Sequence, residues 1–126
     1  MNIQKYQRID HSDKSITVPT GGAGLTGTLK KALATKGWRT SVADGPTITE
    51  GRTGERTFLK TYDTSVTRYT LRTEWNHHDY MLPDFDPVYY FDISVLDNKT
   101  GSEVLTASGS HSGKVIARRF IKALEE

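Results

Sequence analysis

The stretch VYYFDISVLDNKTGSEVLTASGS, residues 88–110, decides the fold class because it encodes two strands and the turn that joins them. Apolar side chains alternate with polar ones in its first half, which is the pattern of a strand with one buried face. The side chains predicted to share the buried face are Tyr89, Phe91, Ile93 and Val95. DNKTG is typical of a tight hairpin turn, with Gly101 available for a positive φ. The returning strand is expected to point Leu105 and Ala107 inward.

The segment before it, RYTLRTEW at residues 68–75, shows the same alternation. Its predicted buried face is again partly aromatic and consists of Tyr69, Leu71, Thr73 and Trp75. Antiparallel sheets with one solvated face produce this clean alternation. We therefore expect Tyr69, Leu71, Phe91 and Ile93 to be core residues on a central pair of strands.

The N-terminal half predicts a strand, a helix and a second strand. SITVPT at residues 15–20 is typical of a short strand, and a helix is expected from about Gly24 to Lys36. Its leucines, at positions 25, 29 and 33, recur at helical spacing, and Gly37 is placed to end it. WRTSVAD at residues 38–44 would return as a strand, which completes a βαβ unit.

The chain is expected to end in a helix, with Ser112 as its N-cap. The apolar stripe of this helix comprises Ile116, Phe120, Ala123 and Leu124. The whole pattern predicts an α+β two-layer sandwich, with a mostly antiparallel sheet, an N-terminal β-α-β unit, a C-terminal helix and both helices on one face. We expect one domain over residues 1–126, with residues 1–13 as a loosely ordered lead-in.

Composition excludes several functional classes. The 126 residues carry a net charge of +2, which argues against a dedicated nucleic-acid domain with a clustered basic face. Cysteine is absent, so disulfides, thiol catalysis and zinc–thiolate sites are excluded. No apolar run reaches 18 residues, so no transmembrane segment is expected. No export signal is seen in the sequence as given, and a lipid anchor in the full-length protein is left open.

The connection NHHDYMLPDFDP, residues 76–87, is the main candidate for binding. Its two prolines cannot donate to a strand ladder and its acidic residues suit solvent, so it is predicted to be a long hairpin connection. Loops of this length are often functional. The predicted binding residues are Trp75, Tyr80, Met81, Leu82 and Phe85. Their apolar side chains either fold back over the edge of the core or form an exposed surface.

A glycine-rich turn supports an alternative function. Gly22, Gly24 and Gly27 form G-x-G-x-x-G between a predicted strand and helix, and Asp44 lies near the position of a ribose-binding acid. Backbone amides at such a helix start can bind a pyrophosphate. A dinucleotide fold, however, needs more parallel strands than this chain predicts. A role in the turn and in close packing is therefore the preferred interpretation of these glycines, and we expect no cofactor.

No catalytic or metal site is predicted. His77 and His78 are adjacent on a predicted strand and would point to opposite faces, so they cannot share one metal ion. Ser110, His111 and Ser112 cluster, but their position suits a helix start and no nucleophile-elbow motif is present. We therefore expect a protein that is not an enzyme.

The C-terminal half, YYFDISVLDNKTGSEVLTASGSHSGKVIARRFIKAL, resembles small bacterial envelope lipoprotein domains of the curli-secretion and penicillin-binding-protein-activator type. The likeness rests on Asp97 with Thr100 and Gly101, and on the helix ending ALATKGW before a strand. It implies a non-catalytic periplasmic domain that binds a partner protein or copies of itself. The alternative is a cytoplasmic nucleotide-binding protein that uses the glycine-rich turn.

Overall fold

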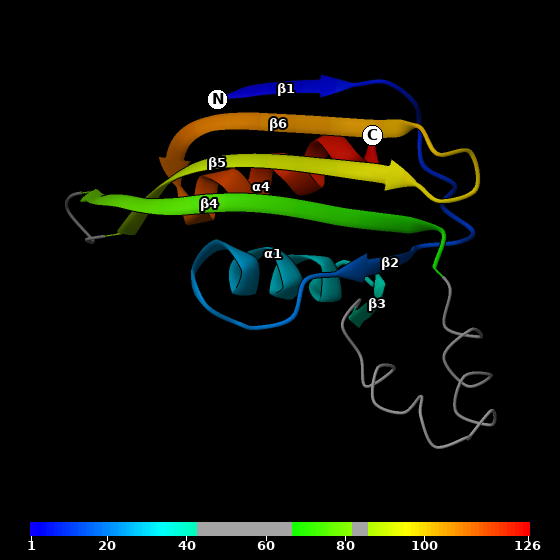
Figure 1. Ribbon diagram of the computed structural model, residues 1–126, viewed down its shortest axis with the longest axis horizontal. Helices are drawn as coiled ribbons and strands as arrows, with labels where there is room; N and C mark the ends of the chain where they lie inside the picture. The colour runs from blue at the N-terminus through cyan, green and yellow to red at the C-terminus, as the bar shows by residue number, and fades with distance from the viewer. Residues whose placement is uncertain (43–66, 82–85) are drawn as a thin grey trace, which may run out of the picture.

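A computed structural model describes residues 1–42, 67–81 and 86–126, with Asp79 and Met81 described by their backbone alone. Two helices and a six-stranded sheet make up this part of the chain (Figure 1). The elements in chain order are β1 (Asn2–Lys5), β2 (Ser15–Val18), α1 (Gly24–Thr35), β3 (Arg39–Val42), β4 (Tyr69–Met81), β5 (Asp86–Asp97), β6 (Glu103–Ser112) and α4 (Gly113–Glu125).

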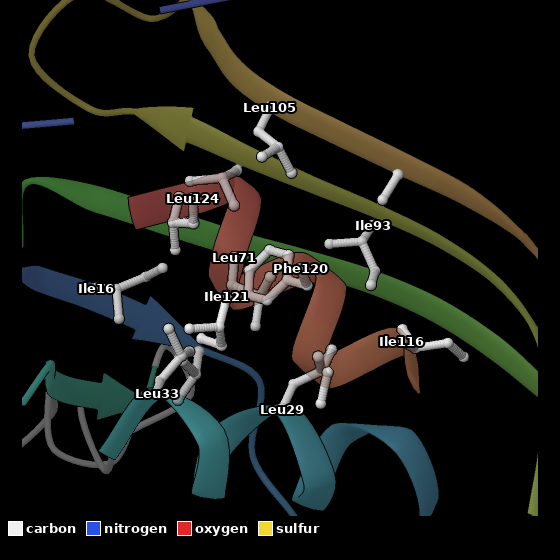
Figure 2. Close-up of a cluster of buried hydrophobic side chains, with 14 of the residues drawn as sticks. Ile16, Leu29, Leu33, Leu71, Ile93, Leu105, Ile116, Phe120, Ile121 and Leu124 are labelled. Carbon is white, nitrogen blue, oxygen red and sulfur yellow. The ribbon is translucent and has the colours of Figure 1, made fainter. Parts of the chain in front are cut away.

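The strand order in the sheet is β1-β6-β5-β4-β2-β3. β2 runs parallel to β3 and to β4, and the other neighbours are antiparallel. Both helices lie on the same side of the sheet and pack against each other (Figures 1 and 2). The predicted α+β two-layer sandwich is confirmed, including the β2-α1-β3 unit and the terminal helix.

The core lies between the helices and the covered face of the sheet (Figure 2). Tyr69, Ile93 and Phe120 are fully buried, and Leu71 and Phe91 are 3% and 6% exposed. The predicted core residues of β4 and β5 are therefore confirmed. Alternation places them on one face because successive side chains of a strand point to opposite sides.

The predicted helix and turn termini are also confirmed. Ser112 Oγ accepts a hydrogen bond from the Val115 amide at 3.3 Å and caps α4. Gly37 follows α1 with φ 84°, and Gly101 closes the β5–β6 turn with φ 78°. A side chain would strain either position, which explains the choice of glycine.

The prediction that residues 1–13 form a loosely ordered lead-in was wrong. β1 pairs with β6, where Ile3 lies opposite Ala107. Ile9 is buried, and the Asp10 amide donates to the Tyr69 hydroxyl at 2.7 Å. Two isolated isoleucines give too weak a local pattern to predict a strand, and the backbone groups of β6 stabilise it instead.

The prediction of a long connection at residues 76–87 was also wrong. β4 continues to Met81 and β5 begins at Asp86, so only residues 82–85 separate the strands. A bulge at His78 absorbs one residue of β4. Pro87 is tolerated because β6 ends opposite Val88, which leaves β5 as an edge strand beyond that point.

Candidate interaction surface

The distal hairpin, residues 75–81 of β4 with residues 86–90 of β5, carries most of the aromatic side chains predicted to bind. It reaches past the helices at the end of the sheet where β4 and β5 are joined (Figure 1). The edge of β4 that faces away from β5 pairs with β2, at Tyr69 and Thr70. Beyond Thr70, the described residues place no strand on that edge. An open strand edge exposes unpaired backbone groups that can recruit another strand.

Trp75 fastens the base of the distal hairpin to α1. Its indole Nε1 donates to Thr26 Oγ1 at 2.9 Å, and its ring meets Tyr89 edge to face at 5.2 Å. The side chain is partly buried and packs against the core. This environment gives Trp75 a structural role.

Tyr80, one of the predicted binding residues, is exposed, with 56% of its surface accessible. Its ring lies against His77 at 4.7 Å between centroids. Met81 ends β4 opposite Asp86, whereas Leu82 and Phe85 lie outside the described residues. The Tyr80 side chain is therefore exposed and does not fold back over the edge of the core.

Tyr90 is a second exposed aromatic residue of the distal hairpin, on the opposite face from Tyr80, although the sequence did not single it out. It is 51% exposed, and its ring lies 4.3 Å from that of His78. Its neighbour Tyr89 is buried, and burial raises the pKa of the Tyr89 hydroxyl. Alternation contained the signal, because Tyr90 falls on the predicted polar face and an aromatic residue there has no core to fill.

The two histidines point to opposite faces of the hairpin, as predicted. His77 contacts Tyr89 and Tyr80, whereas His78 contacts Tyr90. Among the described residues, no group of three or more histidine, aspartate or glutamate side chains is placed to hold a metal ion.

The glycine-rich turn is explained by close packing. A Cβ at Gly24 would collide with the ring of Trp75, and a Cβ at Gly27 would collide with the Gly22 carbonyl. Lys30 Nζ donates to the Gly21 carbonyl at 2.8 Å and braces the same turn. Asp44 lies outside the described residues. Close packing therefore accounts for Gly24 and Gly27.

A buried ion pair closes the opposite end of the hairpin. Arg68 Nε and Nη2 donate to the two carboxylate oxygens of Asp97 at 3.0 and 3.2 Å. Gln7 Nε2 and the Lys99 amide add hydrogen bonds at 3.0 and 2.9 Å. The bonds from Arg68 hold the pKa of Asp97 at about 2, against the opposing effect of burial. Asp97 is one of the residues on which the likeness to envelope lipoprotein domains rests. In this structure its carboxylate stabilises the fold.

The helix layer carries a groove that the sequence did not predict. The helix groove has a volume of about 790 Å³ between α1 and α4 and a floor that includes Ala32, Ala117 and Ile121. Its rims consist mainly of the cationic side chains Lys31, Lys36, Lys114, Arg118 and Lys122, with Glu125 and Glu126 at one end. The net charge of the whole chain, +2, gave no indication of this clustered basic surface.

Comparison with known proteins adds a likeness of fold. A dodecamer of a PelC variant from Paraburkholderia phytofirmans matches with a TM-score of 0.57 at 17% identity, over 98% of this chain and 95% of that one. A second PelC dodecamer from the same organism matches with a TM-score of 0.56 at 14% identity, over 98% and 94%. At these identities the likeness shows the fold alone.

No protein-family model matches the chain, and no curated protein matches its sequence. Neither helix in the described part of the chain has the length and apolar character needed to cross a membrane.

Proposed function

We propose that this chain is a non-catalytic domain that assembles with copies of itself through protein–protein contacts. The observation that carries the proposal is the exposure of Tyr80 and Tyr90 on the distal hairpin. Tyrosine is enriched at protein interfaces because its ring offers a large apolar area and its hydroxyl remains able to hydrogen-bond. These two exposed tyrosines, one on each face of the hairpin, are therefore each suited to contact another protein.

Two further features support self-assembly. The outer edge of β4 beyond Thr70 has no neighbouring strand in the described residues, so backbone groups there can pair with another chain. The solved PelC structures that share this fold over nearly their whole length are dodecamers. Assembly of copies is thus a property already known on this architecture.

We further propose that the domain works in the bacterial cell envelope, on the periplasmic side. The support is the sequence likeness to envelope lipoprotein domains, carried by the Asp97 turn and the final helix. Fractionation of cells that express the full-length gene would test this compartment. Recovery of the protein in the cytoplasmic fraction would contradict it and would favour the alternative location.

The oligomeric state tests the central proposal. Sedimentation velocity over a range of concentrations is expected to show species larger than a monomer for the wild-type chain. Changing Tyr80 and Tyr90 together to Ser should weaken assembly by about a hundredfold or more, because aromatic anchors dominate interface energies. Exposed side chains contribute little to folding, so the melting temperature should change little. A wild-type chain that remains monomeric at every concentration would contradict self-assembly.

A further inference from the structure

Four of the five cations that line the helix groove have no carboxylate partner among the described residues. Lys31, Lys36, Arg118 and Lys122 form no ion pair with any described residue, whereas Lys114 Nζ lies 3.3 Å from Asp86 Oδ1. Between them lies an apolar floor that includes Ala117 and Ile121. A groove of this kind is complementary to a segment that combines carboxylates with apolar side chains.

The chain itself contains such a segment. Residues 79–86, DYMLPDFD, hold three aspartates among four apolar or aromatic side chains and a proline. Resting on the self-association proposed above, we infer that the helix groove of one copy receives residues 79–86 of a second copy. The Asp86–Lys114 pair shows that one aspartate of the segment already meets a cation of the groove rim within one copy.

Along α4 the groove runs from Lys114 to Glu126, which corresponds to about 18 Å at the helical rise. The segment is the tip of the distal hairpin, because Met81 of β4 pairs with Asp86 of β5. Neighbouring strands lie only about 5 Å apart, so the tip is narrower than the groove is long.

The charges along the groove also determine the orientation of the incoming segment. Glu125 is held at one end of the groove by Lys14 at 2.9 Å and by the Trp38 indole at 2.8 Å. Repulsion from Glu125 would keep the aspartates of the incoming segment near Lys31 and Arg118. The donating hairpin and the receiving groove are different surfaces, so the contact is heterologous and repeats from copy to copy.

Charge reversal in the groove tests the contact between copies. Arg118→Glu with Lys122→Glu should shift the wild-type oligomer to monomers in sedimentation velocity. The matched control is Arg72→Glu with Arg119→Glu, which makes the same charge change at exposed residues outside the groove. The control should assemble as the wild type does. Circular dichroism should show that both variants are folded.

A peptide identifies the occupant. A fluorescein-labelled, end-capped peptide of residues 79–86 should bind the folded protein in an anisotropy titration. Binding should weaken at least about tenfold for the groove variant and when the three aspartates become asparagines, because charge pairs across the contact are lost. The control variant should bind the peptide as the wild type does.

Several outcomes would overturn the inference. One is a groove variant that assembles as well as the wild type, which would leave self-association standing through another surface. Another is an anionic vesicle or a duplex oligonucleotide that binds through Arg118 and Lys122 while the peptide does not bind. A monomeric wild type would instead contradict the proposed self-association itself, so the two failures are distinguishable.

Discussion

The two ends of the β4–β5 hairpin are built from the same strands but differ in what surrounds them. Where Tyr69 pairs with Asp97, the Asp97 carboxylate is 1% exposed and is held by Arg68 and Gln7. At the other end, Tyr80 and Tyr90 are each more than half exposed. The enclosed end stabilises the fold, and the open end offers side chains for contact. One long hairpin therefore combines an enclosed, ion-paired end with an exposed, aromatic end.

The largest expected effect comes from the face of β5 that the helices cover. Phe91→Ala should lower the free energy of unfolding by about 3–5 kcal/mol, because Phe91 is 6% exposed and its removal leaves a cavity. The control is Tyr90→Ala on the opposite face, which should cost less than about 1 kcal/mol. Urea denaturation measures both. A similar loss of unfolding free energy for the two variants would contradict the assignment of Phe91 to the covered face and Tyr90 to the open face.

The ion pair at the enclosed end predicts a dependence on pH. The pKa of Asp97 is about 2 in the folded chain, below the value of about 3.9 expected when unfolded. The carboxylate therefore stabilises the fold above about pH 3.9, and this stabilisation is lost as the pH falls through about 2.

Asp97→Asn should cost about 2 kcal/mol near neutral pH, because bonds from the charged Arg68 are weakened. The wild type should lose more stability than this variant between pH 5 and pH 2 in urea denaturation. Asp92→Asn, at an exposed position of the same strand, is the matched control and should follow the wild-type profile. Identical profiles for all three chains would contradict a stabilising role for Asp97.

The smallest predicted effect lies at the boundary between the two ends. Trp75→Phe should cost about 1 kcal/mol by removing the hydrogen bond to Thr26. In a double-mutant cycle with Thr26→Ala, the loss should be smaller when Thr26 is already changed. If the losses of unfolding free energy are strictly additive, the Trp75–Thr26 hydrogen bond contributes nothing. Packing of the Trp75 ring against Gly24 would then anchor the hairpin by itself.

Local periodicity predicted most of the fold. Alternation in residues 68–75 and 88–97 assigned the covered faces of β4 and β5 correctly, and the leucine spacing located α1. The errors lie where tertiary partners override local signals. β1 depends on pairing with β6, and the extension of β4 past Trp75 depends on a ladder with β5 that tolerates a bulge and Pro87.

The candidate site was predicted less completely. Tyr80 was selected as a binding residue, with its exposure left open, and it is exposed, but Trp75 is packed on α1, and Tyr90 was not chosen. Asp86 and Pro87 were taken to lie outside the strands, although an edge position in β5 accommodates both. The pairing of neighbouring strands decides such cases, and a single segment of sequence does not contain it.

The sequence by itself determined which side chains face the core, where the helices begin and end, and that a βαβ unit precedes antiparallel strands. These features follow from residue spacing within one element. Only the tertiary structure decided that Lys31 of α1 and Arg118 of α4 line one groove, and that Arg68 and Asp97 form a buried pair. Each of these contacts joins residues far apart in the chain, and folding brings them together because burial of the shared apolar core fixes the positions of helices and strands.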